Sequence, residues 1–212
     1  MSRAVVLLAT IALASTARAE PSDRDVVLAG IAMAPPMYVL GVSLHESSHA
    51  LAAELVGASV DELHLFPPGR DPHVGVFRFG WTYVHGLSTR RDQELFYLAP
   101  KITDVALLGG FAALVYSGAW PHNRYGSVAL TVVGTGLWVD FAKDVVLFSP
   151  NNDVTKVFDL WCMKGWRQLP ARLVYAAAAV GLGFIVAHGY ERTFVRDPAP
   201  TNPMVPVFAT AF

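Results

Sequence analysis

Two histidines and a glutamate lie close together in the segment His45-Glu46-Ser47-Ser48-His49. Residues four apart on a helix lie one turn from each other, so both imidazoles can reach one metal ion from one face. Glu46 directly follows His45 and therefore lies beside such an ion rather than facing it as a ligand. From there it can take a proton from a water molecule bound to the metal. The segment predicts a metal site with Glu46 as the catalytic base.

The segment lies within a long apolar stretch. As a helix, residues 37–57 would span about 31 Å, which is enough to cross a bilayer. Pro35 and Pro36 either start this helix or lie inside a longer one that begins near Val26. Ionisable side chains at membrane depth are costly unless something satisfies them, and a bound metal ion would do so.

A catalytic zinc site usually has three protein ligands and one position for water, so a third ligand is needed. Asp153 follows the turn-rich break Ser149-Pro150-Asn151-Asn152 at the end of an apolar segment. This position suits a ligand, but an aspartate at a helix N-terminus is also a common cap, and spacing alone leaves both interpretations open. The other candidate ligands are His64, His73, His85, His122, His188, Asp104, Asp140 and Asp144.

Several further charged residues lie within apolar segments. Asp140 and Asp144 are one helical turn apart with Lys143 between them, and Lys101 lies close to Asp104. At membrane depth, mutual pairing or support of the metal ligands is less costly than an isolated charge. We therefore expect these residues to pair or to orient the ligands rather than to bind the metal directly.

The composition is that of a membrane protein. Of the 212 residues, 53% are hydrophobic and 16% are charged, whereas soluble domains have about 25% charged residues. The formal net charge of -1 gives no reason to expect a nucleic-acid partner. The single cysteine, Cys162, excludes an internal disulfide framework and a cysteine-rich zinc site.

We predict a mainly α-helical membrane bundle of about four spans with a small strand insert. Residues 1–19 have the plan of a signal peptide with cleavage after Ala19, and an uncleaved anchor is the alternative. Residues 20–196 form the membrane domain, with a hairpin-like insert at about 60–86. Residues 197–212 are a Pro-rich, extended or disordered tail. The expected spans are 37–57, 98–118, 127–148 and 171–190.

Basic residues gather in two of the connections, 58–97 and 149–170. The positive-inside rule then places both connections in the cytoplasm and the N-terminus outside. Together with a signal peptide, this arrangement indicates the inner membrane of a bacterium. His45 and His49 would lie in the cytoplasmic half of their helix, with the strand insert on the cytoplasmic face.

The segment 43–69, SLHESSHALAAELVGASVDELHLFPPG, resembles the site-2 protease family of intramembrane zinc metallopeptidases. That family has H-E-x-x-H in a transmembrane helix followed by a small strand insert. Leu98-Ala99-Pro100 is also similar to the family's layout. The family completes its zinc site with an aspartate in a Pro/Asn-containing break, to which residues 149–153, SPNND, correspond. The resemblance therefore implies Zn²⁺ held by His45, His49 and Asp153.

The resemblance also implies a reaction. Glu46 would activate water for hydrolysis of peptide bonds in or near membrane-spanning segments of protein or peptide substrates in the lipid bilayer. Asn151 or Asn152 would steady the oxyanion or the substrate backbone. Where the family usually has glycine, this chain has Ser48 and Val154, and it has no room for a PDZ domain. The resemblance is therefore to a divergent, minimal member of the family, either active or inactive.

Two functions from other classes remain as alternatives. The first is a zinc-binding regulatory membrane protein without proteolysis, which would use the same ligands and tolerate replacement of Glu46 by glutamine. The second is a structural or transport-like membrane protein in which the HESSH sequence is coincidental. In that protein Asp140, Lys143 and Asp144 would line a polar path.

Overall fold

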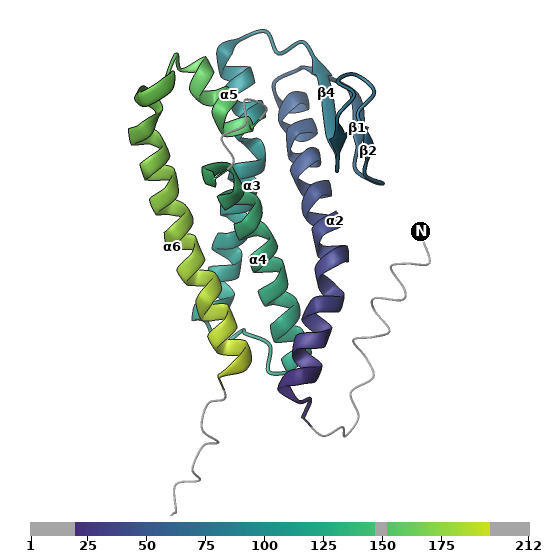
Figure 1. Cartoon of the computed structure of the whole chain (residues 1–212), viewed down its shortest axis with the longest axis vertical. Coiled ribbons are helices and arrows are strands. Elements are labelled where there is room, and N and C mark those ends of the chain that lie inside the picture. Colours follow the sequence, from purple (N-terminus) through teal and green to yellow (C-terminus); the bar gives the residue numbers. More distant parts are fainter. Residues whose placement is uncertain (1–19, 147–151, 196–212) are drawn as a thin grey trace, which may run out of the picture.

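The computed structural model describes residues 20–146 and 152–195. The expected signal peptide, the Pro-rich tail and Asn151 lie outside these residues. Four long helices form an antiparallel bundle (Figure 1), namely α2 Asp23–Leu55, α3 Arg90–Tyr116, α4 Arg124–Val146 and α6 Leu169–Phe194. Each of these helical regions is long and apolar enough to cross a membrane. The prediction of a mainly α-helical bundle with about four candidate membrane spans is confirmed.

Helix α2 is the longer of the two forms that the sequence left open. It begins at a capping box, in which the Ser22 hydroxyl accepts from the Asp25 backbone N–H and the Asp25 carboxylate accepts from the Ser22 backbone N–H. Pro35 and Pro36 lie inside the helix and do not end it. His45 and His49 are consequently in the half of α2 nearer to its C-terminal end at Leu55.

Helix α3 begins earlier than predicted, at Arg90 rather than Leu98. Thr89 and Asp92 form a second capping box, so the charged residues before the apolar run make up the first turn of the helix. The Thr89-x-x-Asp92 spacing is the signal in the sequence for this start. Pro100 lies inside α3.

The insert between α2 and α3 contains four short strands. Strands β1 Ser59–His64 and β4 Trp81–His85 pair antiparallel with a bulge between Val60 and Glu62, and β2 Gly69–Arg70 pairs with β3 Phe77–Arg78. The structure places the insert alongside α2 (Figure 1), and its expected cytoplasmic side stays a prediction. The ring of Phe79 lies 5.1 Å from that of Tyr38, near the middle of α2. The insert therefore extends along α2 to about the middle of that helix.

The main core joins α3, α4 and α6. Its buried residues are Leu108, Phe111, Val115, Trp120, Leu137 and Val186. Phe111 lies against two glycines of the neighbouring helices: a Cβ on Gly134 would lie 2.7 Å from the ring, and one on Gly189 would lie 2.6 Å from it. The small residues let α4 and α6 approach α3 closely.

Gly134→Ala and Gly189→Ala are expected to lower the stability of the bundle by about 1 kcal/mol or more, because the added methyl group overlaps the ring of Phe111. The measurement is thermal unfolding in detergent, followed by circular dichroism. Gly109→Ala is the matched control, since a Cβ there meets nothing within 4 Å and only improves helix propensity. Equal midpoints for the three variants would contradict the close packing.

Candidate metal centre

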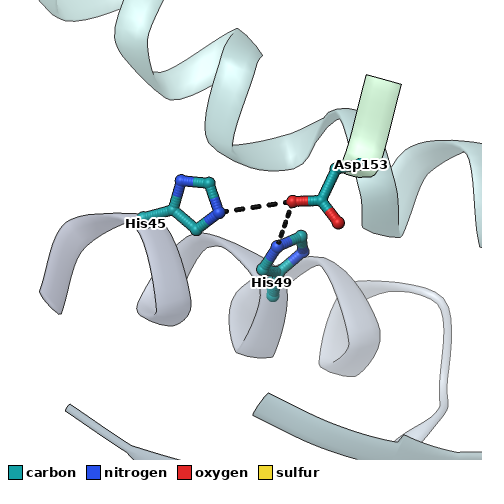
Figure 2. A group of neighbouring side chains, drawn as sticks. All are labelled: His45, His49 and Asp153. Atoms are coloured by element: carbon teal, nitrogen blue, oxygen red, sulfur yellow. Dashed lines mark hydrogen bonds and ion pairs between the residues drawn. The ribbon is translucent and has the colours of Figure 1, made fainter. Parts of the chain in front are cut away.

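The two histidines of α2 meet the first residue of a short helix, α5 Asp153–Leu160 (Figure 2). His45 Nε2 lies 3.3 Å from Asp153 Oδ2, and His49 Nε2 lies 3.2 Å from the same oxygen. The side chains of His45, His49 and Asp153 are 12%, 6% and 13% exposed. This group, which joins residues more than a hundred positions apart in the chain, could hold a metal ion.

Two of the spacings among the three donor atoms fit a tetrahedral ion. Zinc binds imidazole nitrogen and carboxylate oxygen at about 2.0–2.2 Å, which separates neighbouring ligand atoms by about 3.3 to 3.5 Å in a tetrahedron. The two distances from Asp153 Oδ2 to the histidine nitrogens are close to this value. The donor set of two imidazoles and one carboxylate also leaves one coordination position for water or substrate.

The Nδ1 atoms of both histidines have other partners. His49 Nδ1 lies 2.7 Å from the carbonyl oxygen of Phe96 in α3, and His45 Nδ1 lies 2.9 Å from Asp140 Oδ2 in α4. A carbonyl oxygen only accepts, so His49 Nδ1 carries the proton and a neutral ring presents the Nε2 lone pair to Asp153. His49 Nε2 and Asp153 Oδ2 are then both acceptors, and they lie 3.2 Å apart. Their closeness requires a positive charge between them, which a metal ion or a second proton on the His49 ring supplies.

Asn152, not Asp153, caps helix α5. The Asn152 side chain accepts hydrogen bonds from the backbone N–H groups of Val154 and Thr155, which leaves the Asp153 carboxylate to face the histidines. Asp153 Oδ1 accepts from Lys156 Nζ at 3.0 Å, so Oδ2 alone points at the two imidazoles. Burial acts to raise the pKa of Asp153, but its contacts with the two histidines and Lys156 hold that pKa well below its usual range.

Glu46 points to the strand insert. Its Oε2 accepts a hydrogen bond from the Thr82 hydroxyl of β4 at 2.8 Å. Gly80, just before β4, allows this approach, because a Cβ there would lie 2.8 Å from Glu46 Cγ and 3.0 Å from the His64 carbonyl oxygen. The insert therefore sets the position of the Glu46 carboxylate beside the turn of α2 that contains His45 and His49.

The insert is braced around a buried carboxylate. Asp71 is fully buried and accepts hydrogen bonds from the Tyr83 hydroxyl at 2.6 and 2.7 Å, while Arg78 lies within ion-pair distance. Burial acts to raise the pKa of Asp71, but these partners hold it below its usual value. Burial and the same hydrogen bond raise the pKa of Tyr83 to about 12. Tyr83 adjoins Thr82 in β4, so this brace steadies the strand that contacts Glu46.

Asp140 and Asp144 lie behind the centre rather than in it. Asp140 contacts His45, and Asp144 accepts a hydrogen bond from the Asn152 side chain at 2.9 Å. Lys143 pairs with Asp140, and Lys101 lies within ion-pair distance of Asp104, Asp140 and Asp144. The expected pairs are thus parts of one network, in which Lys101 is the shared member. Asn152 contacts the protein through its cap and through Asp144, and its expected role towards substrate stays a prediction.

Ser48 and the remaining histidines have structural contacts of their own. The Ser48 hydroxyl donates to the Leu44 carbonyl oxygen at 2.7 Å and lies 2.9 Å from the hydroxyl of Thr103 in α3, which joins the two helices beside His49. The other histidines with described partners bond elsewhere, namely His64 to Pro67, His73 to Glu62, His85 to Asp61 and His188 to Glu191.

Sequence reasoning did not identify Phe96 or Lys156 as part of the centre. Lys156 lies three residues after Asp153, on the same face of a helix, so its spacing was a usable signal. The Phe96 contribution is a backbone carbonyl, for which residue type gives no signal. Phe96 precedes Pro100 in α3, and a proline removes the hydrogen bond that this carbonyl would otherwise accept in the helix. That relation leaves the carbonyl free to accept from His49.

No family model, curated protein or solved structure matches this chain. The centre consists of two imidazoles and one carboxylate inside a bundle of four apolar helices.

Proposed function

We propose that this chain is an intramembrane zinc metallopeptidase that hydrolyses peptide bonds in or near membrane-spanning segments. The observation that carries the proposal is the convergence of His45, His49 and Asp153, with both Nε2 atoms turned to one carboxylate oxygen at tetrahedral spacing. The donor set, two imidazoles and a carboxylate with one open position, is that of catalytic zinc sites. The likeness of the HESSH segment and the SPNND break to the site-2 protease family supports the same reaction.

The residues of the chain have separate roles in this reaction. Phe96 and Asp140 hold the imidazoles in the orientation that presents Nε2, and Lys156 holds one oxygen of Asp153 away from the centre. Glu46 accepts a proton from the attacking water at its carboxylate and returns that proton to the leaving amine. Zinc, when bound, would polarise the scissile carbonyl and lower the pKa of water towards neutrality.

The proposed substrate class is supported by the helices that surround the centre. The centre is enclosed by α2, α3, α4 and α5, and three of these helices are candidate membrane spans. If these helices span the bilayer, the expected substrate is a membrane-spanning segment made extended rather than a soluble folded protein. The concentration of basic residues in the connections at the α5 and insert end supports a cytoplasmic location for that end, in the inner membrane of a bacterium with the N-terminus outside.

A second candidate function is metal binding without hydrolysis, as in a regulatory membrane protein. The observation that favours it is the hydrogen bond from the Thr82 hydroxyl to Glu46, which occupies one lobe of the carboxylate that the reaction needs. A peptidase would release or share this bond when substrate binds, and a regulatory protein would keep it.

The proposed function is tested with the full chain reconstituted in vesicles that also contain a set of single-span reporter segments with tags at both ends. We expect cleavage that stops on treatment with a zinc chelator and returns when zinc is added. Mass spectrometry of the products locates the scissile bond in or near the span. Bound zinc without cleavage of any reporter would favour the second candidate, and cleavage insensitive to chelation would contradict both.

A further inference from the structure

Lys101 is the most deeply buried basic side chain near the metal centre. It lies on α3, its side chain is 4% exposed, and its ammonium group faces α4. Lys101 Nζ donates to the backbone carbonyl oxygen of Asp140 at 2.6 Å. It also lies 3.0 Å from Asp140 Oδ2 and 3.0 Å from Asp144 Oδ2. One ammonium group thus contacts two carboxylates of the same helix.

The first of these carboxylates, that of Asp140, contacts His45. Asp140 Oδ2, the oxygen that Lys101 contacts, is also the oxygen that lies 2.9 Å from His45 Nδ1. A carboxylate that accepts from the outer nitrogen of a metal-binding histidine fixes the ring orientation and raises its basicity as a ligand. The ammonium group therefore fixes the oxygen that orients His45.

The second carboxylate, that of Asp144, is linked to Asp153 through Asn152. Asp144 accepts from Asn152 Nδ2 at 2.9 Å, and Asn152 is the cap of α5 that immediately precedes Asp153. The C-terminal end of α5 is anchored to α3, where the indole of the C-cap Trp161 donates to Glu94 at 2.8 Å. The position of Asp153 relative to the histidines thus depends on Asp144 as well as on the packing of α5.

A positive charge is required at the position of Lys101. The side chains of Asp104 and Asp144 are 8% and 6% exposed, and Asp104 Oδ2 lies 3.7 Å from Lys101 Nζ. Buried carboxylates are costly unless they are paired. Lys143 offers a second ammonium group, but it is 39% exposed and pairs with Asp140. Lys101 is therefore the buried cation that the three carboxylates share.

We propose that Lys101 is a positioning residue for the metal centre, because it holds Asp140 against His45 and Asp144 against the cap that precedes Asp153. It touches neither metal nor substrate and acts through these two carboxylates. This role rests on the proposed metal centre. Through it, one side chain of α3 fixes the position of His45 on α2 relative to Asp153 on α5.

The test is titration of the detergent-purified full chain with cobalt(II), whose visible absorption reports tetrahedral coordination, and with zinc in competition with a chelating dye. Lys101→Met removes the charge and keeps the length of the side chain. We expect Lys101→Met to bind zinc about 10 to 100 times more weakly than wild type, with a changed cobalt spectrum. Circular dichroism identifies the preparations in which the helices are retained.

Lys143→Met is the matched control, since Lys143 contacts the same Asp140 but not Asp144. Its zinc affinity is expected to stay within about threefold of wild type, because exposed ion pairs contribute little. An equal loss in both lysine variants would overturn the specific role of Lys101. A folded Lys101→Met protein with wild-type affinity and spectrum would also overturn it.

Asp144→Asn decides the question if Lys101→Met does not fold, because this variant removes the charge that Lys101 Nζ contacts on Asp144, keeps the buried cation and leaves an amide oxygen that can still accept from Asn152. We expect weaker zinc binding and a changed cobalt spectrum, and unchanged values would contradict the proposal. Wild-type protein that binds neither metal would overturn the metal centre itself. If wild type binds metal and all variants bind it equally well, the metal centre stands and only the role of Lys101 is overturned.

Discussion

Detergent-purified protein is expected to contain about one zinc ion per chain, and His49→Ala and Asp153→Ala are each expected to reduce this to less than about a tenth. Elemental analysis after gel filtration is the measurement. His49 is 6% exposed and supplies one of the three donor atoms. Asp153 supplies the oxygen that lies at tetrahedral spacing from both imidazoles.

The reason for so large a loss is the small number of ligands. Removing one of three protein ligands leaves two donors, and water must complete the site in competition with bulk hydration of the ion. The Asp153→Ala variant also leaves the Lys156 ammonium group next to the site without its carboxylate partner, and this positive charge repels a cation. Both effects act against binding.

Matched controls are available for both ligands. Asp159→Ala removes an exposed aspartate from the same helix, α5, and His188→Ala removes a histidine that bonds Glu191 in α6. Both controls are expected to keep the zinc content of wild type. A well-folded wild type without zinc would mean that the HESSH sequence is coincidental, and the two ligand variants would then behave like their controls.

Glu46→Gln is expected to reduce hydrolysis of membrane-spanning reporters by at least about a hundredfold while zinc content stays near one per chain. Glutamine has the shape of glutamate and its amide oxygen can still accept from the Thr82 hydroxyl, so the contact with β4 is retained. What glutamine cannot do is accept and return a proton near neutral pH. The variant therefore separates the chemical role of Glu46 from its structural role.

The control for this variant is Glu54→Gln, on the exposed side of the same helix two turns further on. Its cleavage rate is expected to equal that of wild type. Cleavage by Glu46→Gln protein at the wild-type rate would remove the assigned proton transfer. In a cellular assay, a phenotype that depends on His49 and Asp153 but tolerates Glu46→Gln would favour the non-proteolytic metal protein.

The sequence by itself determined the elements of this protein. The apolar runs were long enough to predict four spans, because a bilayer demands about twenty apolar residues per helix. The i, i+4 spacing of His45 and His49 was sufficient to predict that both imidazoles lie on one face, because a helix fixes that relation locally. Helix α3 begins at Arg90, before the span expected from Leu98, because the capping residues Thr89 and Asp92 precede the apolar run.

Tertiary structure decided which distant groups meet these histidines. Spacing left Asp153 as either ligand or helix cap, and the structure assigns the cap to Asn152 and turns Asp153 towards α2. The contacts of His49 with the Phe96 carbonyl and of Asp140 with Lys101 join separate helices. Helix packing sets such contacts, since local sequence patterns specify the face of a helix but not the partner that it faces.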